Sequence, residues 1–169
     1  EARAANCLAA LGLAAPTFDG WCALIGGATG CPLNSEQTEF FRAVTQRDPL
    51  PAPCRELWLA IGRRGGKNRV SAALVVFLAL LMPWQLALGE TGTIMVLASD
   101  RAQARVAFRY IRGLLESDDS LLQEVVNVTA DTITLRNGVE IAIGTADNAA
   151  VRGRTILACI CEEFAFWPH

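Results

Sequence analysis

Residues 56–80 read ELWLAIGRRGGKNRVSAALVVFLAL, and three kinds of sequence follow one another in them. The first seven residues are mostly apolar and end at Gly62, which is typical of a short buried strand. Residues 63–68 carry two glycines and three cations, a composition that favours a loop. Residues 68–82 are again mainly apolar and end before Pro83, which predicts a helix. The sequence therefore predicts a strand, a glycine-rich loop and a helix in succession.

A loop between a strand and a helix can bind phosphate, because its backbone N–H groups and the helix N-terminus attract an anion. Gly65 and Gly66 permit a tight backbone, and Lys67 supplies a mobile cation for the outer phosphates. The pattern is close to a P-loop, but Ile61 replaces its first glycine and Asn68 replaces its Ser/Thr. Asn68 offers Mg²⁺ a carbonyl oxygen on a longer side chain, so a phosphate-binding loop of this sequence would bind the metal more weakly. The alternative to a phosphate-binding loop is a structural turn with solvated arginines.

Strand and helix patterns alternate after this loop. We expect buried strands at residues 92–100 and 155–163, a helix at 101–117, and a hairpin at 131–146 around Asn137-Gly138. This order predicts an α/β fold with a mainly parallel central sheet, flanking helices and a hairpin insertion.

The N-terminal third has a different composition. Residues 1–32 are expected to form an extension, with an Ala-rich helix over the first dozen residues and a loop marked by Gly26, Gly27 and Gly30. Residues 33–169 would form the main domain. It would start with a helix through EQTEFFRAV, capped by Asn34 or Ser35, and an extended connector at residues 47–53.

Two carboxylates, Glu162 and Glu163, follow the last apolar strand. Phosphoryl hydrolysis needs one group to anchor the metal and another to orient or deprotonate the attacking water. Adjacent residues of an extended chain point to opposite faces, so the two cannot do the same job. We expect Glu162 to hold Mg²⁺ through water and Glu163 to act as the catalytic base. An acidic helix N-terminus is the simpler alternative for this pair considered alone.

Arginines can stabilise the charge that develops on a transferred phosphoryl group. The candidates are Arg63 and Arg64 in the loop, and Arg152 and Arg154 on either side of Gly153, which permits an exposed turn. For each of them, a solvated or salt-bridged side chain is the alternative.

The composition excludes several classes of protein. The chain has 169 residues, of which 52% are hydrophobic, with 15 basic and 17 acidic side chains, so it is neither disordered nor strongly basic.

Residues 55–113 nevertheless carry nine basic and three acidic groups, which predicts an anionic partner there or solvated helix faces. Six cysteines without a CxxC pair, and one histidine, argue against a zinc site. The even count of cysteines also allows disulfides, but a large, core-rich chain favours a reducing cytosol. The apolar run at residues 72–88 is too short to cross a membrane, and we expect a buried helix.

Four motifs occur together in a known family. The stretches GRRGGKN, ASDRAQARVAF, GTADNAAVRGRT and ICEEFAFW together resemble the ATPase domain of large terminase subunits of tailed bacteriophages. NSEQTEFFRAV and RDPLPAP fit the same family, so the resemblance covers about residues 33–167. It implies a RecA-like P-loop NTPase fold of the ASCE class, in a motor that uses ATP and Mg²⁺ to drive double-stranded DNA into a procapsid.

The resemblance also implies roles for single residues. It assigns nucleotide binding to Gln37, through the adenine, and to the loop residues Gly62, Arg64, Gly65, Gly66, Lys67 and Asn68. It assigns the metal to Asn68 and Glu162, and catalysis to Glu163, Arg63 and Arg152. Arg152 would reach the nucleotide of a neighbouring subunit, with Arg154 as the second candidate.

The implied partners are double-stranded viral DNA, the portal protein, the small terminase subunit and further copies of the chain in a ring. The resemblance implies that the protein is located in the cytoplasm of a bacterial host and does not bind a membrane. The family has further strands and a nuclease domain, whereas this chain ends six residues after Glu163, so we expect an incomplete ATPase domain. Because Asn68 and Glu162 depart from the family's Ser/Thr and Asp, a nucleotide-binding assembly module with weak or no turnover is an alternative. Another helicase-like P-loop translocase is a third possible function.

Overall fold

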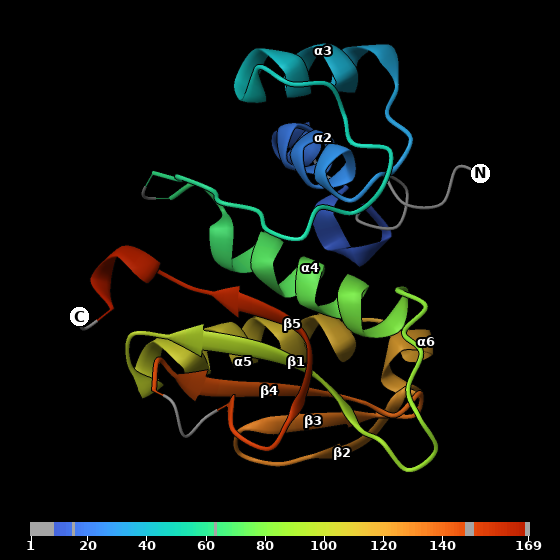
Figure 1. Ribbon diagram of the computed structural model, residues 1–169, viewed down its shortest axis with the longest axis vertical. Helices are drawn as coiled ribbons and strands as arrows, with labels where there is room; N and C mark the ends of the chain where they lie inside the picture. The colour runs from blue at the N-terminus through green and yellow to red at the C-terminus, as the bar shows by residue number, and fades with distance from the viewer. Residues whose placement is uncertain (1–8, 15, 63, 148–150, 168–169) are drawn as a thin grey trace. The chain divides into compact units, whose positions relative to one another are not determined.

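The computed structural model describes residues 9–14, 16–62, 64–147 and 151–167 (Figure 1). The chain divides into two compact units, Glu1–Val70 and Ser71–His169, and each is described by itself. Helix α4 (Lys67–Leu80) begins in the first unit and continues into the second.

The first unit contains helices α2 (Asp19–Ala28) and α3 (Ser35–Thr45), preceded by the short turns η1 (Ala9–Leu13) and η2 (Pro16–Phe18). The predicted cap of α3 is confirmed, because the Asn34 side chain accepts from the Gln37 amide at 2.8 Å in a capping box. Of the Ala-rich helix predicted at the N-terminus, residues 1–8 lie outside the described residues, and η1 is interrupted at Gly12, where φ is +81°.

The loop predicted at Gly26 and Gly27 is wrong, since both residues lie inside α2. Their small size serves close packing. A Cβ added at Gly27 would lie 2.4 Å from the Phe41 ring, and one at Gly26 would lie 2.8 Å from the Leu33 side chain. These glycines let other parts of the first unit approach α2 closely, which helical glycines do at some expense of helix propensity.

The predicted connector at residues 47–53 has neither helix nor strand structure, and hydrogen bonds tie it to the C-terminal end of α2. The amides of Leu50 and Cys54 donate to the carbonyls of Gly27 and Ala28 at 2.8 and 2.9 Å.

The strand predicted at residues 56–62 is wrong. This segment belongs to no strand, and Leu57, Trp58 and Leu59 are 43%, 72% and 40% exposed. An apolar run meets the hydropathy requirement of a strand, but a strand also needs a neighbour for its backbone hydrogen bonds. All strands in the described residues lie between Gly92 and Cys161, and they pair with one another.

The second unit is built on a five-stranded mixed sheet of order β2-β3-β4-β1-β5. The strands are β1 (Gly92–Ala98), β2 (Val125–Val128), β3 (Thr132–Leu135), β4 (Val139–Thr145) and β5 (Thr155–Cys161). β1 pairs in parallel with β4 and β5, whereas β2, β3 and β4 pair antiparallel. Thus the predicted strands at 92–100 and 155–163 and the hairpin are confirmed, while β2 was not predicted.

Helix α5 (Arg101–Leu115) confirms the helix predicted at 101–117 and packs against β1 and β4 (Figure 1). The short helix α6 (Asp119–Leu122) leads from it to β2. β1, the strand with two parallel neighbours, is buried at every residue, as expected of a central strand.

The part of α4 within the second unit is the buried helix predicted from the apolar run. Val75, Val76 and Ala79 are fully buried, and the Ala79 carbonyl accepts from the Asn137 side chain at 2.8 Å. No helix in the described ranges is long and apolar enough to cross a membrane.

Candidate functional site

In the glycine-rich loop (residues 62–68), residues 64–66 turn directly into α4, which begins at Lys67. Arg64 and Gly66 have φ of +63° and +77°, in the left-handed region. That conformation is easy for glycine and strained for arginine. A Cβ added at Gly66 would also lie 3.2 Å from the Phe18 ring. Both residues lie just before the N-terminus of α4 at Lys67, where the orphan amides of a helix attract anions.

Aromatic and cationic side chains of the first unit hold this loop in place. Trp21 Nε1 donates to the Gly65 carbonyl at 2.9 Å. Arg69, in the first turn of α4, donates to the Gly12 carbonyl at 2.6 Å, and its guanidinium lies 5.0 Å from the centroid of the Phe18 ring. These residues were not predicted, because no motif marks them and their partners are distant in the chain.

The remaining loop candidates differ in exposure. Gly62 and Arg64 are exposed, Lys67 and Asn68 are half-buried, and Arg63 lies outside the described residues. Gln37 has a structural role, since its Oε1 accepts from the Asn34 amide at 3.1 Å in the capping box of α3. Its contact with adenine stays a prediction.

In the second unit, the parallel strands end at one edge of the sheet, where ligands of α/β proteins usually bind. The register places Leu97 opposite Cys161 and Ala98 opposite Thr145. Glu162 and Glu163 therefore extend from the same edge as the carboxyl ends of β1 and β4.

Glu162 is fixed by its backbone and lacks a partner for one side-chain oxygen. Its amide donates to the Leu97 carbonyl at 2.8 Å, and its carbonyl accepts from Trp167 Nε1 at 3.0 Å. Its Oε1 is buried and has no hydrogen-bond partner among the described residues. Buried carboxylate oxygens normally have a partner, so this atom fits an interaction with water or with a water-bound cation.

Glu163 has a strained backbone, with φ of +52° and ψ of +39°. For a residue with a Cβ this conformation costs about 1–2 kcal/mol, and such strain is concentrated at functional sites. The chain leaves the extended conformation here, so the alternation of faces assumed from the sequence ends with Glu162. The turn continues into η3 (Phe164–Phe166), where the Phe166 amide donates to the Glu163 carbonyl at 2.9 Å.

Two further carboxylates follow the neighbouring strands and were not predicted as candidates. Asp100 caps α5 by accepting from the amides of Ala102 and Gln103 at 2.8 and 2.9 Å, and Asp147 accepts from Thr145 Oγ1 at 2.7 Å. The signal for both was a carboxylate two residues after a parallel strand. Within the described ranges, no three His, Cys, Asp or Glu side chains come together as a metal cage. Mg²⁺ in proteins is commonly held by one or two carboxylates together with water and phosphate oxygens.

The two arginine candidates beside Gly153 differ. Arg154 is paired with Glu140 of β4 at 2.6 Å, and the two side chains are 35% and 21% exposed. Arg152 is exposed and has no ion pair within the part of the chain that the structure describes. This difference favours Arg152 as the arginine that is available to another molecule.

Cys159 and Cys161 lie on the same face of β5, with their sulfurs 3.8 Å apart. Both thiols are free, as are those of Cys22, Cys31 and Cys54. Although the residue is exposed as a whole, partial burial of its sulfur raises the pKa of Cys159 to about 12, and the neighbouring Cys161 thiol adds to the effect.

We expect alkylation of Cys159 in the folded protein to speed up about tenfold per pH unit up to at least pH ~10, because only the thiolate reacts. The measurement is peptide-resolved mass spectrometry after timed exposure to iodoacetamide. The same cysteine in urea-unfolded protein is the control, and its rate should level off above pH ~9. A plateau near pH ~9 in the folded protein would contradict the raised pKa.

Comparison with known proteins supports the fold. The structure is similar to the crystal structure of the HK97 bacteriophage large terminase, with a TM-score of 0.57 and 20% sequence identity. The similarity covers 86% of this chain and 30% of the terminase chain. No family model and no curated protein sequence matches the chain. The resemblance to large terminases inferred from motifs is thus confirmed at the level of the fold, an α/β structure with a mixed five-stranded sheet flanked by helices.

Proposed function

We propose that this chain is the ATP-hydrolysing part of a DNA-packaging motor of the large-terminase type, with a P-loop of the ASCE class. The observation that carries the proposal is the end of β5, where Glu162 has a buried, unpartnered oxygen and Glu163 has a strained backbone. The similarity of the fold to a large terminase supports it, although the chain spans 30% of that protein. Coupling to translocation of double-stranded DNA into a procapsid is part of the same proposal.

The two groups of residues have complementary chemistry. The glycine-rich loop and the N-terminus of α4 bind the phosphates through backbone amides, and Lys67 neutralises the outer ones. Asn68 and Glu162 are the residues that would hold Mg²⁺, which neutralises charge on the phosphate oxygens when bound. Glu163 accepts a proton from the attacking water, and Arg152 contacts the nucleotide of a neighbouring copy. This last role requires a ring of subunits, with the portal protein and the small terminase subunit as further partners.

A binding measurement with a Lys67→Ala variant tests the proposal. We expect the variant to bind a fluorescent ATP analogue with Mg²⁺ at least about tenfold more weakly, because a charge-assisted contact to phosphate is lost. Arg47→Ala is the matched control, since it removes an exposed cation of the same unit outside the loop. Equal affinities of the Lys67→Ala and parent proteins would reject the proposal.

Asn68 and Glu162, which depart from the family's pattern, favour a second candidate function, a module that binds nucleotide without hydrolysing it. Both residues stand at predicted metal ligands, where they replace the family's Ser/Thr and Asp. A helicase-like translocase is the third candidate, and it alone predicts strand separation of duplex DNA.

A further inference from the structure

Helix α5 carries four arginines on one flank: Arg101, Arg105, Arg109 and Arg112. Their spacings of four, four and three residues place them within an arc of about 80° on a helix with 3.6 residues per turn. The buried side of α5, which packs on the sheet, consists of Ala104, Ala107, Phe108, Ile111 and Leu115. These four arginines, the α5 arginine stripe, are all exposed and extend over about 16 Å.

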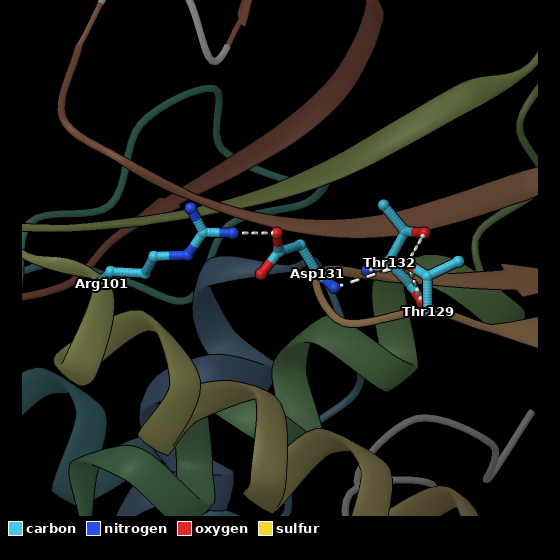
Figure 2. A network of polar contacts seen from close by, with 4 residues as sticks. All are labelled: Arg101, Thr129, Asp131 and Thr132. Carbon is cyan, nitrogen blue, oxygen red and sulfur yellow. Dashed lines mark hydrogen bonds and ion pairs between the residues drawn. The ribbon is translucent and has the colours of Figure 1, made fainter.

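Acidic neighbours compensate the two ends of the stripe. Figure 2 shows Arg101 paired with Asp131, whose amide donates to Thr129 Oγ1 at 3.4 Å in the turn between β2 and β3. At the other end, Arg112 is paired with Glu116 at 2.6 Å. Arg101, Arg112 and Glu116 are exposed, whereas Asp131 is half-buried and its Oδ1 has no hydrogen-bond partner among the described residues. A surface pair such as Arg112–Glu116 contributes only about 0–1 kcal/mol, so Arg112 can exchange Glu116 for another anion.

The middle of the stripe is uncompensated. Arg105 and Arg109 are exposed, and neither has an acidic partner among the residues that the structure describes. Tyr110, which is 48% exposed, lies next to Arg109 and adds a hydroxyl that can donate to an oxyanion. The loop and carboxylates of the proposed ATP site do not include any of these residues.

We propose that the α5 arginine stripe binds the phosphate backbone of duplex DNA. Adjacent arginines of the stripe are about 6 Å apart along the helix, and the whole stripe spans the axial length of about five phosphates of one strand. Such contacts read charge rather than base sequence, which suits a motor that moves along DNA. The choice of DNA among polyanions rests on the proposed function, whereas the position of the stripe rests on the geometry of α5.

The test compares the full chain with an Arg105→Gln/Arg109→Gln double variant. Fluorescence anisotropy with a labelled duplex of mixed sequence gives the affinity at several salt concentrations. We expect the double variant to bind at least about fivefold more weakly at ~0.1 M salt, and to lower the slope of log affinity against log salt by about 1.8. Arg105→Lys/Arg109→Lys should retain the slope of the parent, because both charges remain.

Two further measurements keep the outcome unambiguous. Arg42→Gln/Arg47→Gln, with the same change of charge on and just after α3, should bind DNA like the parent. Unchanged circular dichroism of the α5 variant excludes misfolding as the cause of its weaker binding. A salt slope of the double variant equal to that of the parent would overturn the inference. Displacement of the parent from labelled DNA by polyglutamate as effectively as by unlabelled duplex would also overturn it. Lys67-dependent ATP binding is measured separately, so a failure of the stripe is distinguishable from a failure of the proposed function.

Discussion

Replacing Glu163 by glutamine is expected to slow DNA-stimulated ATP hydrolysis by about 10²–10⁴-fold, the range associated with loss of a general base. Glutamine has nearly the same shape and can still form hydrogen bonds, but it cannot accept a proton from the attacking water. The backbone at Glu163 is left-handed, and glutamine is strained there to the same degree as glutamate, so the turn should be kept. ATP affinity should therefore change by less than about twofold, because the change affects the chemical step rather than binding.

The matched control for this variant is Glu39→Gln, the same chemical change at an exposed position of α3. It should leave both hydrolysis and ATP affinity unchanged. Equal hydrolysis by Glu163→Gln and the parent protein would remove Glu163 from the catalytic role. A parent that binds ATP without turnover, and gains it with Asn68→Ser and Glu162→Asp, would instead identify a nucleotide-binding module.

The parts of the fold that the sequence predicted correctly have local causes. Asn137-Gly138 specifies a tight turn, and Gly138 has the positive φ, +84°, that such a turn needs. Asn34 starts α3 through a capping box that closes within four residues. In both cases, the residues that determine the structure are neighbours in the chain.

The wrong predictions have non-local causes. The apolar residues 56–62 look like a strand, but a strand exists only where another strand accepts its hydrogen bonds. Gly26 and Gly27 look like a loop, but they are small because Leu33 and Phe41 pack against them. A single sequence does not show which distant segment will lie against a residue.

The same distinction applies to the candidate site. The carboxylate pair after an apolar run pointed to Glu162 and Glu163, and the strand before them exists as β5. The loop was found from its own glycines and cations and from the helix after it, whereas the strand expected before it does not form in residues 56–62. The strain at Glu163, the anchoring of the loop by Trp21, and the pairing of Arg154 with Glu140 depend on tertiary contacts or backbone angles. The resemblance ranked Arg152 before Arg154, and the structure adds a physical difference, since Arg154 is paired with Glu140.

Gly30→Ala is expected to destabilise the first unit by about 2–4 kcal/mol, for two reasons that add. Gly30 has φ of +73°, which alanine adopts only with strain. A Cβ there would also lie 2.7 Å from the Cα of Ala52 and 2.9 Å from its N and C atoms. These are backbone atoms of the connector, which cannot swing away as a flexible side chain would, so the connector itself must move. Urea unfolding followed by circular dichroism measures the loss of stability.

Hydrogen exchange locates the same effect in the structure. The amides of Leu50 and Cys54 attach the connector to the carbonyls of Gly27 and Ala28, so their exchange should accelerate in Gly30→Ala. Gly113→Ala is the matched control, because a Cβ added at that helical position of α5 meets no atom within 4 Å. It should raise stability by about 0.5–1 kcal/mol through helix propensity, so the same substitution at two glycines should have opposite signs. If Gly30→Ala were as stable as the parent, neither the left-handed turn nor the close approach of Ala52 could be required for folding of the first unit.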